Sequence, residues 1–175
     1  FNYGLVYDKR DVKFQPTDGY ISRWYQELPL ISSNSSIINS YSITSYNELA
    51  DNMVLSTGIF LKAVNSLDNN KDVRVSKRLY IPSKRLRGFE SGKVGPKDGD
   101  DFVGGNYITT LNLSTNLPGI LSTMENLDFS YFIDVGNIWG VDYDSAVDQS
   151  STIRSSTGLG MDWLTPIGPL SFSLT

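Results

Sequence analysis

The chain has 175 residues, a net charge of −4, and neither cysteine nor histidine. Without these two residue types a disulfide framework, a cysteine nucleophile, a Ser-His pair and the usual zinc ligands are excluded, while catalysis by carboxylates stays possible. Charged residues make up 19% of the sequence, and the negative net charge argues against a nucleic-acid partner.

The N-terminal segment FNYGLVYDKRD shows no targeting signal. It lacks the charged stretch followed by an apolar run that marks a signal peptide. No run in the chain approaches the roughly 18 apolar residues of a transmembrane helix. The chain is therefore either cytosolic or an internal piece of a longer precursor. Because residues 1–8 already alternate as the middle of a strand does, an internal piece is favoured.

Alternation with a period of two predicts β-strands in the first part of the chain. These predicted strands cover residues 1–8, 20–30, 37–48 and 53–64. In the last of them, Ile59 and Leu61 alternate with Gly58 and Lys62. The two faces of 37–48 are poorly distinguished, so this strand rests on weaker evidence than the others.

A long basic loop, residues 66–104, follows the fourth predicted strand. Its segment RLYIPSKRLRGFESGKVG carries five of the chain's 15 Lys and Arg residues around Arg87-Gly88-Phe89. These charges require either bulk solvent or a polar cavity.

The second half of the chain alternates again. Its predicted strands cover residues 106–117, 126–139, 158–163 and 169–175. Within 126–139, Tyr131 and Ile133 lie on one face, and Asp128 and Asp134 lie on the other. Short connections, such as Ala50–Asn52, alternate with long ones.

About eight strands with a polar face of Ser, Thr, Asn and Gly are typical of a barrel wall around a water-filled lumen. Trp24, Trp139 and Trp163 fit the aromatic residues that anchor such a wall at the membrane interface. The pattern therefore favours a transmembrane β-barrel. A soluble β-sandwich also has strands with one polar face, and it remains the alternative.

Five segments, in order along the chain, carry a resemblance to a known family. They are the turn around Asp8, Arg10, Asp11, Pro16, Thr17 and Gly19, the loop RLRGFESG, and the strands VGGNYITTLNLS, FIDVGNIW and GLGMDWLTPIGPLSFSL. On these motifs the chain resembles the C-terminal half of the barrel of the BamA family of outer-membrane insertases, in the bacterial surface antigen superfamily.

The resemblance implies an all-β fold: an antiparallel transmembrane β-barrel that is incomplete, with about eight of roughly sixteen strands. Residues 1–175 would form a partial outer-membrane barrel domain with a lumen-directed loop at about 66–104. The N-terminal periplasmic domains and the last strand would be absent. The lateral gate of the family lies between its first and last strands, so neither gate edge is expected in this chain, and its edge strands would be left unpaired.

The resemblance also implies a contact between the loop and the lumen wall. Arg87 of the loop would meet Asp134, beside Gly136, while Gly88 allows close backbone approach and Phe89 packs on the wall. In the family a second acidic residue lies on the neighbouring strand. Counting from Gly104-Gly105-Asn106, we place Ser114 at that position, so Asp134 would act alone. Replacing Arg87 by Ala or Asp134 by Asn in the full-length protein is expected to lower barrel stability and client insertion. Exchanging the two charges should restore part of that loss.

The implied function is the insertion and folding of client β-barrel proteins into the bacterial outer membrane, without catalysis, cofactor or metal. The implied partners are the outer-membrane lipid bilayer, unfolded β-barrel clients and accessory assembly lipoproteins, with no nucleic acid. The alternatives are a translocation pore of the same superfamily, of the two-partner secretion or translocation-assembly type, and the barrel anchor of a surface lipase.

Overall fold

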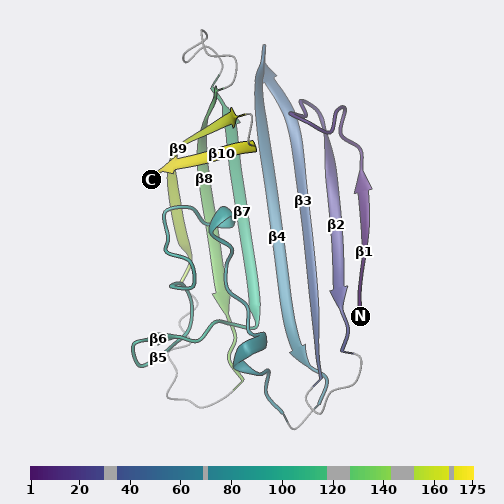
Figure 1. Ribbon diagram of the computed structural model, residues 1–175, viewed down its shortest axis with the longest axis vertical. Coiled ribbons are helices and arrows are strands. Elements are labelled where there is room, and N and C mark those ends of the chain that lie inside the picture. The colour runs from purple at the N-terminus through teal and green to yellow at the C-terminus, as the bar shows by residue number, and fades with distance from the viewer. Residues whose placement is uncertain (30–34, 69–70, 118–126, 143–151, 166–167) are drawn as a thin grey trace.

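The computed structural model describes residues 1–29, 35–68, 71–117, 127–142, 152–165 and 168–175. Within them, eight strands form one antiparallel sheet in the order β1-β2-β3-β4-β7-β8-β9-β10, which Figure 1 shows as an open, curved wall. The strands are β1 (Asn2–Asp8), β2 (Gly19–Glu27), β3 (Ser36–Ala50), β4 (Met53–Ser66), β7 (Tyr107–Asn116), β8 (Leu127–Trp139), β9 (Arg154–Thr165) and β10 (Gly168–Leu174). The expected all-β, antiparallel and unclosed barrel wall is confirmed.

The predicted strand 37–48, whose faces were poorly distinguished, is the longest strand of the sheet, β3. Its neighbours define its faces, because Ile43 is level with Ile59 of β4 whereas Thr44 is level with Gly58. A register shift between Glu48 and Ala50 ends the regular pairing before the turn into β4. Cross-strand packing therefore settles a face that the sequence of one strand leaves open.

The sheet has an inner face, which carries the long loop, and an outer face, which does not. On β8 the inner side chains Phe132 and Asp134 are fully buried, whereas the outward Tyr131 and Ile133 are 40% and 37% exposed. Large hydrophobic side chains are exposed on the outward side of the other strands as well, among them Leu5, Tyr41, Ile59, Leu61, Leu111, Leu159 and Phe172. An apolar surface this extensive is suited to lipid rather than to water.

The outward apolar residues form a band that crosses the sheet obliquely. One row of paired residues runs across five strands and serves as a reference line: Thr44, Gly58, Asn112, Asp134 and Ser156. From this row, the outward Tyr41 and Leu61 lie toward the end of the sheet where the long loop is attached. The outward Leu159 and Trp163 lie toward the opposite end. A membrane plane cuts strands in this way when they tilt by about 35–45°, as in transmembrane barrels.

The loop between β4 and β7 forms the second layer over part of the inner face (Figure 1). It contains the short turns η1 (Val75–Lys77) and η2 (Ser83–Arg85) and the ribbon of β5 (Lys97–Asp98) and β6 (Asp101–Phe102). Among the described residues, no helix is long and apolar enough to cross a bilayer.

The main apolar core lies between this loop and the wall. Its members are Val64, Ile108 and Ile138 of the strands and Val73, Leu79, Ile81, Leu86 and Val94 of the loop. The described strands thus pack against a loop rather than against a second large sheet, which distinguishes the fold from the sandwich alternative.

Replacing outward Ile59 by Lys in the complete protein should lower the free energy of unfolding in lipid vesicles by about 2–4 kcal/mol, because the ammonium group would face hydrocarbon. Urea unfolding measured by tryptophan fluorescence checks this value. The control Val75→Lys lies on an exposed part of the loop and should change little. Equal losses for both variants would contradict a lipid-facing outer surface.

Candidate functional site

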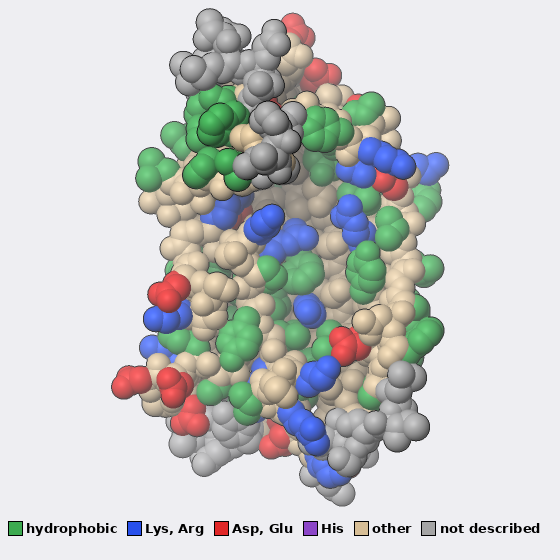
Figure 2. Space-filling model, viewed as in Figure 1, with side chains coloured by type: hydrophobic (Ala, Val, Ile, Leu, Met, Phe, Trp, Pro, Cys, Tyr) green, Lys and Arg blue, Asp and Glu red, His purple; other side chains and the backbone are tan. Residues whose placement is uncertain are grey.

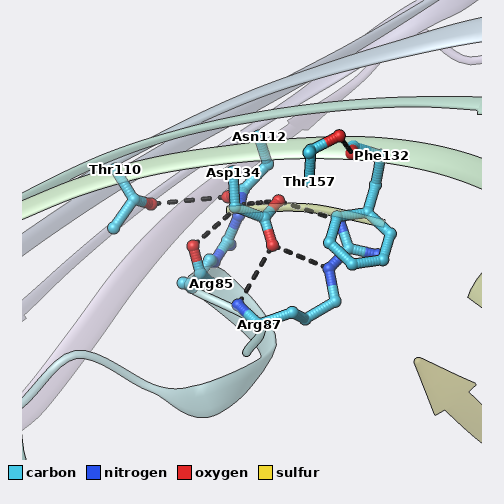
Figure 3. A network of polar contacts seen from close by, with 7 residues as sticks. All are labelled: Arg85, Arg87, Thr110, Asn112, Phe132, Asp134 and Thr157. Carbon is cyan, nitrogen blue, oxygen red and sulfur yellow. Dashed lines mark hydrogen bonds and ion pairs between the residues drawn. The ribbon is translucent and has the colours of Figure 1, made fainter. Parts of the chain in front are cut away.

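The basic loop is attached to the wall by an ion pair between Arg87 and Asp134 (Figure 3). Asp134 lies in the middle of β8 with its side chain fully buried, and Arg87 follows the turn η2. The guanidinium donates from Nε to Oδ2 at 2.7 Å and from Nη2 to Oδ1 at 2.8 Å. The backbone N–H of Arg87 also donates to Oδ2, at 3.1 Å. A bidentate fork of this kind is among the stronger and more directional polar contacts in proteins.

Asn112 of β7 joins the carboxylate to the loop backbone. It is level with Asp134 in the sheet, and its side-chain amide donates to Asp134 Oδ1 and to the carbonyl oxygen of Arg85, both at 2.8 Å. The Thr110 hydroxyl donates to the side-chain oxygen Oδ1 of Asn112 at 3.4 Å. Asp134 therefore accepts four hydrogen bonds, which nearly saturates a carboxylate.

Phe132 provides an aromatic platform for the same guanidinium. Its ring is fully buried on the inner face, and the Arg87 guanidinium carbon lies 3.5 Å from the ring centroid. A desolvated cation–π contact contributes about 2 kcal/mol. Because a lysine offers neither a planar group for stacking nor two parallel donors, this position requires arginine.

Two glycines give the loop room to dock. Gly88 has φ +82°, and a Cβ atom there would lie 2.8 Å from Thr175 Oγ1, so both backbone conformation and space favour glycine. Gly136 lies under the loop, where a Cβ would be 3.5 Å from both terminal methyl groups of Leu86. Phe89, beyond the turn at Gly88, packs half-buried against the apolar core.

The structure brings Arg87, Gly136 and Asp134 together but places Ser114 elsewhere. Ser114 is level with Phe132, and Asn112 occupies the position across from Asp134. Asn112, two residues before Ser114, therefore supports the contact from the neighbouring strand. The correspondence of Ser114 to the second acidic position of the family stays a prediction. Asn112 and Ser114 lie on the same face of β7, because residues two apart on a strand share a face.

The three tryptophans lie in outward-facing rows near the two ends of the sheet. Trp24 meets Tyr3 edge-on with ring centroids 5.5 Å apart, and Trp139 lies 5.8 Å from Tyr107. Trp163, near the other end of the wall, is 45% exposed. Their role as interfacial anchors remains a prediction.

A second attachment of the loop was not predicted from the sequence. Asp142, just after β8, accepts a hydrogen bond from the backbone of Val73 at 2.8 Å and another from the Asn106 side chain. It thereby connects both ends of the loop to the chain after β8. In the described part of the chain, no three acidic side chains gather where they could hold a metal ion.

Comparisons with known proteins agree with this fold. Residues 1–175 match the Omp85 superfamily domain. The chain is 28% identical, over 174 residues, to the outer membrane protein assembly factor BamA of Neorickettsia risticii (strain Illinois), covering 97% of this chain and 23% of that protein. It is 30% identical, over 175 residues, to BamA of Nitratidesulfovibrio vulgaris, covering 95% of this chain and 21% of that protein.

A solved structure shows the same fold. The crystal structure of BamA from Haemophilus ducreyi lacking POTRA domains 1–3 superimposes with a TM-score of 0.82 at 24% identity, over 98% of this chain and 37% of that one. The chain thus spans less than a quarter of the length of the two relatives named above.

Replacing Arg87 by Ala in the complete protein should destabilise the barrel by about 3–5 kcal/mol, because a buried carboxylate loses its charged partner. Urea unfolding in lipid vesicles measures the loss. The matched control is Lys93→Ala, which removes an exposed pair with Glu90 and should have little effect. The same loss in both variants would contradict a structural role for the buried pair.

Exchanging the two charges, Arg87→Asp with Asp134→Arg, should restore almost none of this stability. An arginine at 134 cannot accept the hydrogen bonds that Asn112 and the loop backbone donate there. This revises the expectation from the sequence that an exchange recovers part of the loss. Recovery to near the parent stability would show that charge alone, and not the donor geometry, determines the contact.

Proposed function

The chain belongs to the Omp85 superfamily, and on that premise we propose that the complete protein inserts and folds client β-barrel proteins into the outer membrane in which its own barrel lies. The observation that carries the proposal is the loop fastened to the inner wall by Arg87 and Asp134. Both relatives described above are named outer membrane protein assembly factors. The proposed role involves no catalysis and no cofactor.

In this proposal the described strands supply a stiff wall. Adjacent strands pair continuously from β1 to β10, and the loop fills part of the inner face with an apolar core. Fastening the loop through Asp134 and Asp142 keeps this half of the barrel in one shape. Deformation can then be confined to other strands, where a client strand could pair with an exposed edge.

No covalent step is required, because the free energy of insertion comes from the client itself. A client barrel buries its own outward apolar residues in lipid and closes its own hydrogen-bonded ladder. The assembly factor only lowers the barrier to that process. The proposed partners are therefore the lipid bilayer, unfolded β-barrel clients and, from the family resemblance, accessory assembly lipoproteins.

The complete protein, reconstituted into lipid vesicles, should accelerate the folding of a urea-denatured eight-stranded client barrel relative to protein-free vesicles. Folding is followed by the mobility shift of the unboiled client on gels. The Arg87→Ala variant should fold the client more slowly, whereas Arg74→Gln, at an exposed site in the same loop, should match the parent. Ion conductance without any acceleration of client folding would favour a translocation pore instead.

A further inference from the structure

Arg85 lies two residues before Arg87 but reaches a different part of the inner wall. Its guanidinium carbon is 5.0 Å from the ring centroid of Phe60. Nη1 lies over Gly58, 3.7 Å from where a Cβ atom would be. The backbone of Arg85 is held on both sides, because its N–H donates to Pro82 at 2.8 Å and its carbonyl accepts from Asn112. The charged group therefore stays against the wall while the loop is docked.

The Arg85 guanidinium is half-buried without an acceptor. Within the described part of the chain, no hydrogen bond or ion pair forms at its nitrogens, and its neighbour is the ring of Phe60. Burial lowers the pKa of Arg85, and the charge of Arg23 lowers it further, while Asp134 acts in the opposite direction. None of the Arg85 nitrogens is among the buried polar atoms without a partner, so water still reaches the group. Its partial desolvation nevertheless favours an anion beside it.

Arg23 extends from β2 into the same region. It is level with Ser42 of β3, which in turn is level with Phe60 of β4. The backbone of Arg23 is therefore two strands, or about 10 Å, from the backbone of Phe60, whose ring lies under Arg85. Arg23 also has no hydrogen-bond acceptor among the described residues. Figure 2 shows Lys and Arg side chains gathered over the middle of this face. Two like charges here repel each other unless an anion lies between them.

The nearby carboxylates of the inner wall are already engaged. The pairs are Asp8 with Arg10, Glu27 with Lys77, and Asp134 with Arg87. Asp128 of β8 and Asp162 of β9 are level with each other and are not near. Each lies six residues from the row of Asp134 and Ser156, and six residues of strand span about 20 Å. The described wall therefore supplies no counter-ion for Arg23 and Arg85.

We propose that Arg23 and Arg85 together form an oxyanion site on the inner wall, which binds a carboxylate or a phosphate. Two guanidinium groups present planar donor pairs that match the oxygens of either anion. The anion comes from one of two sources: an acidic side chain elsewhere in the complete protein, or free phosphate from solution. In both cases the anion links β2 to the loop at a point where Arg23 of the wall otherwise repels Arg85 of the loop. The site is independent of the proposed assembly activity.

The test uses the complete protein in detergent and measures its thermal unfolding midpoint in sodium phosphate and in sodium chloride of equal ionic strength. The variants are Arg85→Gln and Arg23→Gln, and Arg74→Gln is the matched control from the same loop. Arg23 lies in β2, so its variant tests the site even if Arg85→Gln prevents the loop from folding. The readout is stability, so a failure of client assembly would not affect it.

For free phosphate, the parent and the control should show a saturable rise of the midpoint, and each site variant should bind phosphate about 10- to 100-fold more weakly. For an internal carboxylate, phosphate should have no effect, but each site variant should lower the midpoint below that of the control. The proposal is overturned if phosphate has no effect and the variants keep or raise the midpoint, since relief of repulsion then dominates. It is also overturned if the phosphate effect persists undiminished in both variants.

Discussion

Asp134 places a carboxylate where water does not reach, and the position of the loop depends on satisfying it. Its side chain is fully buried, and an ionised carboxylate in such surroundings is stable only with donors around it. Three of its four hydrogen bonds come from Arg87, and the fourth comes from Asn112. Since one loop residue supplies most of the donors, the charge is satisfied only when the loop is docked.

The apolar core and the ion pair strengthen each other. Leu86, next to Arg87, is buried in the apolar core with Ile108 and Ile138, and it lies over Gly136, two residues from Asp134. Exclusion of water makes the attraction between Arg87 and Asp134 stronger, and it makes an unpaired Asp134 more costly. A single-layer wall with lipid on its outer side thus gains a locally dry interior from a loop rather than from a second sheet.

Alternation along the sequence was sufficient to locate the strands and to assign most side chains to a face, because a period of two is a property of each strand by itself. It could not supply the register between strands, so it could not show that Asn112 lies beside Asp134. Phe132 carried an unused signal, since a large aromatic ring on the polar face of a strand suggests a specific partner. The contact of Arg85 with Phe60 depends on the path of the loop, which no local pattern encodes.

The turn that delivers Arg87 to the wall also delivers Arg85, and the wall treats the two charges differently. Arg87 meets a carboxylate, whereas Arg85 meets a ring and the like charge of Arg23. Asn112 contacts both the Asp134 carboxylate and the Arg85 carbonyl. If Arg85 moves away from the wall, the contacts of Arg87 with Asp134 therefore weaken, and the reverse also holds. An anion at Arg23 and Arg85 removes the repulsion that opposes docking. By linkage, binding of the anion stabilises the docked loop by the same free energy by which docking of the loop strengthens anion binding.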